Sequence, residues 1–243
     1  MFPATIFDFN GVLVDDEFVH RDAFRDVLTP LGVSFTDEDY TERYLGYDDL
    51  GAVRAMLADA GRAASEAEVA EIARAKQPFY MRRAEQSLVV FQGAADLVRA
   101  RARHGPVGIV SGALRPEIAF ALRRMSLDDA VSFIVSAEDT TRCKPDPMGY
   151  EAAIAWLSER IGPKPARRAI VIEDSLAGIQ SAKAAGLPCL AVAHSYPEAQ
   201  LISAGADAVA PSLSAVDDAL LAALYRDLGL SAAIEPAPPR RPG

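Results

Sequence analysis

Five side chains that can carry chemistry follow short apolar segments of the sequence. They are Asp8, Ser111, Lys144, Glu173 and Asp174. A carboxylate serves as a nucleophile or as a metal ligand, and a serine hydroxyl followed by Gly112 can bind anionic oxygens where a helix begins. Three carboxylates around a divalent ion, with one hydroxyl and one ammonium group for the anionic oxygens, would make a phosphoryl-transfer site.

Each of these signals is weak when it is taken alone. An Asp after a strand often only satisfies turn amides, and a Ser-Gly pair is usually just a turn. A Glu-Asp pair before a helix is most often an N-cap. Lys144 stands out more, because the chain has only four lysines among its 25 basic residues. We favour the functional interpretation because all four polar stretches follow predicted strands, whose carboxyl ends open onto the ligand crevice of an α/β sheet.

The elements that must position these side chains alternate regularly after Gly93. Apolar segments predict strands at 5–9, 107–110, 133–136, 169–172, 189–193 and 208–209, and helical patterns separate the later ones. Strands that alternate with helices predict a parallel, doubly wound sheet. The predicted fold class is therefore α/β.

Between the first two of these strands the pattern is helical throughout. Helices are expected at about 18–31, 36–45 and 50–60, and Ser65 with Glu68 has the capping-box pattern of a fourth. So long a helical stretch cannot be a simple crossover. We predict an inserted small α-helical cap at 16–90, a core formed by 1–15 and 91–230, and linkers near 15–17 and 85–91 that act as a hinge. The Pro-rich tail at 231–243 is predicted to be disordered.

Composition narrows the class of partner. A net charge of −9 argues against nucleic acid and against an anionic membrane. Cys143 and Cys189 form neither a metal-binding spacing nor a disulfide framework, and no apolar run is long enough to span a bilayer. Met1-Phe2-Pro3 leads straight into the first strand, so we expect no signal peptide and a cytoplasmic protein. No pattern indicates an oligomeric state.

Four segments of the sequence together resemble the motifs of the haloacid dehalogenase superfamily. They are Phe7–Asp15, Val110–Gly112, Cys143–Pro147 and Val171–Ile179. The Lys-Pro-Asp-Pro and Glu-Asp-Ser-Leu-Ala-Gly forms are most similar to the β-phosphoglucomutase-like phosphatase branch, and the helical insertion resembles the small cap of that superfamily. The resemblance covers nearly all of residues 4–225.

The resemblance implies a role for each of these side chains. Asp8 is expected to be the nucleophile that forms an aspartyl-phosphate, and Ser111, Gly112 and Lys144 are expected to hold the transferred phosphoryl group. Mg²⁺ would be held by Asp8, the main-chain carbonyl of Asn10 and Asp174, with Glu173 in the inner or second shell. The implied substrate is a small phosphorylated metabolite such as a sugar phosphate.

Asn10 departs from the family pattern. The superfamily normally has Asp at this position, where it is the general acid and base. An amide cannot exchange a proton at neutral pH, so a factor of roughly 10²–10⁴ in rate is at risk. Three explanations stay open. The first is a natural protein that is slow, uses another acid or only binds phosphoesters, and the second is an introduced substitution. The third is a substrate whose leaving group needs no proton, so that the metal and Lys144 suffice.

Two side chains of the predicted cap bear on the choice of branch. His20 lies close to the hinge and matches a histidine common in the mutase-like branch, so we predict that it binds substrate, although a polar helix residue is the ordinary alternative. Lys76 is the only lysine of the cap and lies far from the hinge along the chain, which disfavours the phosphonate-cleaving branch with its Schiff base.

The prediction is a Mg²⁺-dependent phosphatase. A phosphosugar mutase and a low-turnover phosphometabolite-binding protein are the alternatives. A metal-independent dehalogenase is disfavoured, because it would have no use for Glu173 and Asp174.

Overall fold

The computed structural model describes residues 2–230, and the predicted tail at 231–243 lies outside them. At its centre is a six-stranded sheet with the strand order β5-β4-β1-β6-β7-β8. Every neighbouring pair is parallel. The strands are β1 (Thr5–Phe7), β4 (Val107–Val110), β5 (Phe133–Val135), β6 (Ile170–Glu173), β7 (Cys189–Val192) and β8 (Ala208–Ala210).

The two faces of the sheet bury two separate hydrophobic clusters. Alternate residues of one strand belong to different clusters: Phe7 lies in one and Ile6 in the other, and Ile172 and Val171 are divided in the same way. Strands covered on both faces are expected to be apolar throughout, as β4 is and as β6 is up to its last residue, Glu173. The doubly wound α/β fold is confirmed. Its helices are α5 (Ala94–Ala102), α6 (Arg115–Met125), α7 (Met148–Ile161), α8 (Pro163–Ala166), α9 (Leu176–Ala184), α10 (Glu198–Ser203) and α11 (Asp218–Asp227).

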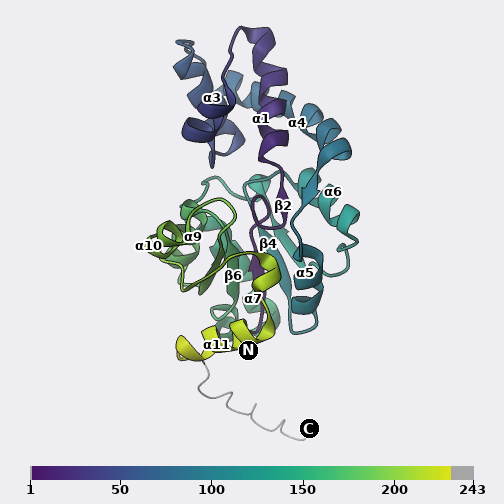
Figure 1. Ribbon diagram of the computed structural model, residues 1–243, viewed down its shortest axis with the longest axis vertical. Helices are drawn as coiled ribbons and strands as arrows, with labels where there is room; N and C mark the ends of the chain where they lie inside the picture. Colours follow the sequence, from purple (N-terminus) through teal and green to yellow (C-terminus); the bar gives the residue numbers. More distant parts are fainter. Residues whose placement is uncertain (1, 231–243) are drawn as a thin grey trace, which may run out of the picture.

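A helical part stands over one end of this sheet (Figure 1). It consists of α1 (Glu17–Leu28), the 3₁₀ turn η1 (Thr29–Leu31), α2 (Asp37–Asp39) continuing into the π-turn η2 (Tyr40–Tyr44), α3 (Asp49–Asp59) and α4 (Glu66–Ser87). It has a hydrophobic cluster of its own, which includes Phe24, Val53, Leu57 and Val69. Ser65 caps α4 by accepting a hydrogen bond from the Glu68 amide. The helices fall where the periodicity predicts them, and the proposed bounds of the two parts stay a prediction.

The chain passes between the two parts through a short ribbon. β2 (Val14–Asp15) and β3 (Val89–Val90) pair antiparallel, and the Phe91 amide donates to the carbonyl of Leu13 over 3.1 Å. The predicted linkers therefore meet each other. Strands of two residues carry no readable period, which is why the sequence did not show them. Within residues 2–230 no helix combines the length and the apolar character that crossing a membrane requires.

Candidate active site

The parallel sheet brings the carboxyl ends of its strands to one edge. Asp8 follows β1 directly, Ser111 follows β4, Glu173 ends β6 and Asp174 comes next. Lys144 reaches this edge from the loop after β5: its Nζ donates to Asp8 Oδ1 over 2.7 Å and to Glu173 Oε1 over 2.7 Å. We call Asp8, Lys144, Glu173 and Asp174 the strand-edge cluster.

Two glycines of the sequence motifs make room for these carboxylates. Gly11 has a φ of +74°, which favours glycine, and a Cβ there would collide with the Asp174 carboxylate. A Cβ on Gly178, in the first turn of α9, would collide with the Glu173 carboxylate. The close approach of the loop after β1 to Asp174 therefore depends on Gly11, and the close approach of α9 to Glu173 depends on Gly178.

Glu173 is fully buried, and both of its oxygens are used within the protein. Oε1 accepts from Lys144 and from the Tyr150 hydroxyl, the latter over 3.1 Å. Oε2 accepts from the amides of Asp174 and Ser175 and from the Ser175 hydroxyl. Burial raises the pKa of Glu173, but the Lys144 charge and these hydrogen bonds outweigh it and hold the pKa below its usual value. Glu173 thus anchors Lys144.

Asp174 has the opposite environment. Its Oδ2 accepts from the Ser195 hydroxyl, whereas Oδ1 is buried and has no hydrogen-bond partner among the described residues. Burial, followed by the negative charges of Glu173 and Asp8, raises the pKa of Asp174 well above its usual value. An unsatisfied buried carboxylate oxygen is costly, and coordination of a cation would satisfy it.

The cluster as a whole fits a hard divalent cation. Asp8, Glu173 and Asp174 each offer an oxygen within 4.8 Å of the others. Their three formal negative charges face the single ammonium group of Lys144. Oxygen ligands of this kind suit Mg²⁺ or Ca²⁺. Burial, opposed by Lys144 and reinforced by Glu173, raises the pKa of Asp8 to about 7, so a cation would also favour the ionised form of Asp8.

Ser111 and Gly112 lie beside this cluster, where the chain turns toward α6. The Ser111 hydroxyl accepts from the Ala113 amide over 3.1 Å and donates to Asn10 Oδ1 over 3.2 Å. Gly112 is exposed, and a Cβ there would meet open space. A hydroxyl and the backbone amide of an exposed glycine ahead of a helix are suited to anionic oxygens.

Asn10 and His20 connect the strand edge to the helical part. Asn10 Nδ2 donates to the two oxygens of Asp16 and lies 3.3 Å from His20 Nε2. His20 does not open freely into the crevice: its side chain is 13% exposed, and its ring lies 4.5 Å from that of Tyr80. The predicted contact of His20 with substrate stays a prediction.

Lys76 lies against His20, with its Nζ 2.6 Å from His20 Nδ1. The inference that Lys76 lies far from the hinge was wrong. The helices α1 and α4 pack side by side, so Lys76 lies close in space to His20 although it is far from it along the chain (Figure 1). Lys76 is fully buried, pairs with Asp49 and lies 4.2 Å from the centre of the Phe24 ring. We call Asp16, His20, Asp49 and Lys76 the helix cluster.

Glu117 of α6 faces the helix cluster from the sheet side. It is 2% exposed; Oε2 accepts from the Leu114 amide, and Oε1 is buried without a partner among the described residues. Burial raises the pKa of Glu117 to about 7, although the charges of His20 and Lys76 oppose the shift.

The loop after β7 supplies two neighbours of the candidate site, His194 and Ser195, that sequence reasoning missed. His194 Nδ1 lies 2.8 Å from the Gly11 carbonyl, and its ring stacks on Phe91 at 4.0 Å. Ser195 donates to Asp174. The signal was available, because this loop also follows a core strand at the same edge of the sheet.

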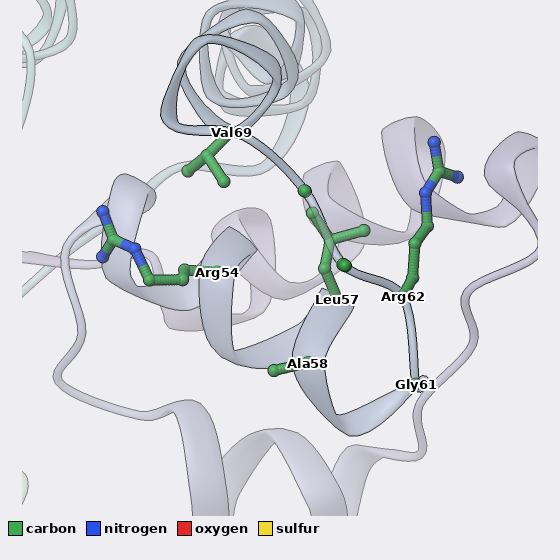
Figure 2. A pocket seen from close by; sticks show the side chains of 8 residues that line it. Arg54, Leu57, Ala58, Gly61, Arg62 and Val69 are labelled. Atoms are coloured by element: carbon green, nitrogen blue, oxygen red, sulfur yellow. The ribbon is translucent and has the colours of Figure 1, made fainter.

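A hollow of about 470 Å³ lies elsewhere, on the helical part between α3 and the start of α4 (Figure 2). Two arginines line it, but both are occupied: Arg54 pairs with Glu66, and Arg62 pairs with Glu68. None of the predicted site residues lines this hollow.

Comparison with known proteins identifies a family and similar phosphatases, in agreement with the chemistry that the strand-edge cluster suggests. A family model for haloacid dehalogenase-like hydrolases matches residues 2–186. A validoxylamine A 7'-phosphate phosphatase from Streptomyces hygroscopicus subsp. limoneus is 29% identical over 208 residues, which cover 84% of this chain and 92% of that protein.

Two solved structures share the architecture. CbbY from Rhodobacter sphaeroides in complex with phosphate superposes with a TM-score of 0.75 at 26% identity, covering 88% of this chain and 96% of that chain. A β-phosphoglucomutase from Clostridium difficile gives 0.80 at 20% identity over 95% and 100% of the two chains, and shows the fold alone. The family resemblance drawn from the four motifs is confirmed.

Proposed function

Because this chain belongs to the haloacid dehalogenase-like hydrolases, we propose that it is a Mg²⁺-dependent phosphatase of small phosphorylated metabolites, such as sugar phosphates, acting through an aspartyl-phosphate on Asp8. The observation that carries the proposal is the ion pair of Asp8 with Lys144 beside Asp174, whose buried Oδ1 has no hydrogen-bond partner among the described residues. The relatives support the substrate class, since one is a phosphatase of validoxylamine A 7'-phosphate and CbbY was crystallised with phosphate.

The reaction has two displacements at phosphorus. A carboxylate oxygen of Asp8 attacks the phosphorus atom, the bond from phosphorus to the ester oxygen breaks, and the departing oxygen takes up a proton. Water then attacks the phosphorus of the aspartyl-phosphate. Inorganic phosphate leaves, the water's proton is released, and the Asp8 carboxylate is restored.

The surrounding side chains bind and orient the phosphoryl group. Glu173 and the Val110 carbonyl hold the Lys144 ammonium beside Asp8, where it can offset the charge of the phosphoryl oxygens. The Ser111 hydroxyl and the amide of Gly112 would accommodate a second phosphoryl oxygen. Fixed donors of this kind need no reorganisation during the reaction.

The carboxylate oxygens of Asp8, Glu173 and Asp174 lie within 4.8 Å of one another, close enough to serve one divalent ion. Asp8, Asp174 and the main-chain carbonyl of Asn10 would hold Mg²⁺, with Glu173 as the neighbour that orients Lys144. Bound there, the ion would neutralise charge on the phosphoryl oxygens.

A second function is supported by one specific observation. The amide of Asn10 stands where the family has a proton-transferring carboxylate, and its hydrogen bonds to Asp16 and Ser111 hold it in place. A phosphometabolite-binding protein with low turnover is therefore the competing proposal. For the third alternative, a phosphosugar mutase, no specific observation among the described residues adds support.

The experiment measures phosphate release from p-nitrophenyl phosphate and a panel of sugar phosphates, with Mg²⁺ and with excess chelator. We expect release that requires the metal and that Asp8→Asn lacks. Saturable calorimetric binding of a sugar phosphate without release would favour the binding protein. Equal release by Asp8→Asn and the parent would contradict both.

A further inference from the structure

The side-chain amide of Asn10 is fixed at both ends. Its Nδ2 donates to the two carboxylate oxygens of Asp16 over 3.0 and 2.9 Å, and its Oδ1 accepts from the Ser111 hydroxyl over 3.2 Å. A carboxylate can only accept, so Asp16 requires the nitrogen end of the amide. Asn10 therefore joins the helix cluster to the strand edge in a single orientation.

Asp16 is the more deeply buried member of this pair. It is 0% exposed and stands directly before α1, but its side chain does not cap that helix. The Tyr80 hydroxyl donates to its Oδ2 over 2.5 Å, and His20 Nε2 lies 3.3 Å from the same oxygen. The groups that reach Asp16 are thus an amide, a hydroxyl and a ring nitrogen, all of which can donate.

A carboxylate at position 10 does not suit these surroundings. It would place an oxygen where Nδ2 now lies, 2.9 Å from Asp16 Oδ2. Two carboxylate oxygens at such a distance repel each other, because both are acceptors and neither offers a hydrogen to the other. The substitution would also remove a hydrogen-bond donor from a buried acceptor, which is itself destabilising.

We propose that Asn10 and Asp16 form a matched pair, in which Asp16 positions the side-chain amide of Asn10. A carboxylate at residue 10 then serves as a general acid and base only in a protein whose residue 16 carries no charge. This inference rests on the proposed phosphatase function, because the benefit of a carboxylate would appear in turnover. Asp16 is a positioning residue, since it acts through Asn10.

A double-mutant cycle tests the pair, using Asn10→Asp, Asp16→Asn and the exchanged variant that carries both, with p-nitrophenyl phosphate and Mg²⁺. Asn10→Asp alone should lower the melting temperature and raise kcat less than about fivefold, because two carboxylates then face each other. The exchanged variant should recover the melting temperature. It should raise kcat by about 10²-fold or more, with KM within about threefold of the parent, because it combines an acid–base group with a restored amide–carboxylate pair.

Asp15→Asn is the matched control, because Asp15 is the exposed neighbour and loses the same charge. Added to Asn10→Asp, it should change neither kcat nor melting temperature. Asp16→Ser provides a second uncharged residue 16 in case Asp16→Asn folds poorly. Peptide mass spectrometry of the parent must show intact Asn10, because Asn-Gly sequences deamidate.

Three results would overturn the pairing. Asn10→Asp alone could reach the kcat of the exchanged variant, the exchanged variant could match the parent, or the two substitutions could shift the melting temperature additively. If none of the four proteins turns over any substrate, the phosphatase function fails instead. The melting temperatures would then still decide whether the two side chains are coupled, so the two claims fail separately.

Discussion

Asn10 contacts Asp16 of the helix cluster and, on its other side, Ser111, which lies beside the strand-edge cluster. The two clusters are held in place by different parts of the fold. The strand-edge cluster stands on strand ends and on main-chain groups: Lys144 also donates to the Val110 carbonyl, and Glu173 accepts from the amide of Ser175. The helix cluster is held by side chains of separate helices, as in the contacts of Lys76 with His20 and Asp49.

This difference in support predicts that substitutions in the two clusters affect different properties, the rate of the reaction in one and the stability of the fold in the other. Parallel strand ends fix the strand-edge cluster wherever the sheet forms, so a substitution there should act mainly on the reaction. The helix cluster depends on how α1, α3 and α4 pack, and a buried charge that loses its partner is strongly destabilising. A substitution there should act mainly on folding and on the placement of Asn10.

The sharpest test of this contrast is to neutralise the lysine of each cluster in turn. Lys144→Gln should lower kcat by roughly 10²–10³-fold, because it removes a fixed cation beside Asp8. Lys76→Gln is the matched substitution: it should lower kcat less than about tenfold but cost about 3 kcal/mol in the free energy of unfolding. Steady-state kinetics and urea unfolding of both variants measure these effects. The reverse pattern would refute the division of roles.

The metal requirement sharpens the account of the strand edge. Asp174→Asn should raise the Mg²⁺ concentration for half-maximal activity by about 10–100-fold, because it weakens the carboxylate of the strand-edge cluster whose buried Oδ1 has no hydrogen-bond partner among the described residues. Titration of activity with Mg²⁺ measures this. Ser195→Ala, which removes the hydroxyl that holds Asp174 Oδ2, should produce a smaller shift in the same direction. An unchanged requirement in Asp174→Asn would place the ion elsewhere.

Glu117 offers a pH test of the helix side. A carboxyl group whose pKa is raised to about 7 on folding binds more protons in the folded than in the unfolded protein between its two pKa values. Stability therefore falls as the pH rises through that window. The charges of His20 and Lys76, which face Glu117, oppose the rise in its pKa, whereas the negative charge of Asp49 adds to it.

We expect Glu117→Gln to stabilise the protein relative to the parent by about 1–3 kcal/mol more at about pH 8 than at about pH 5. Urea unfolding in metal-free buffer at both pH values measures the difference. Glu85→Gln, an exposed glutamate of α4, should show no such pH dependence. An equal effect of Glu117→Gln at both pH values would mean that Glu117 does not titrate in this range.

The smallest expected effect concerns the ribbon between the two parts. If the helical part closes over the strand edge, a substrate analogue with Mg²⁺ should slow hydrogen exchange at β2 and β3 several-fold, because closure restricts the opening of the pairs Val14–Val90 and Asp15–Val89. Mass spectrometry of peptides covering 13–17 and 88–92 reports it. Unchanged exchange on binding would indicate a static helical part.

The strand-edge cluster could be predicted from the sequence, because the topology of a parallel sheet determines where its residues lie. Each of its residues follows a short apolar segment, and parallel strands must deliver such residues to one edge. The same rule would have found His194 and Ser195 after β7. It does not show which oxygens of Glu173 are already occupied, since that depends on Tyr150 and Ser175.

The helix cluster could not be predicted in this way. From the sequence alone, Lys76 is expected to be an ordinary solvated residue of a helix. It is buried because α4 packs against α1, and no local sequence pattern predicts that packing. Asn10 likewise reads as the loss of an acid when it is seen alone. Its relation to Asp16 appears only when the turn after β1 places the two side chains together.

The central claim, that Asp8 is phosphorylated during turnover, is tested most directly by rapid-quench intact-mass spectrometry after mixing with p-nitrophenyl phosphate and Mg²⁺. Because Asn10 cannot activate water, hydrolysis should be slower than transfer. We predict a species heavier by one phosphoryl group, mapped by peptide analysis to Asp8, in the parent and none in Asp8→Asn. Metal-dependent phosphate release with no such species at any quench time, or with the added mass on another residue, would contradict the account.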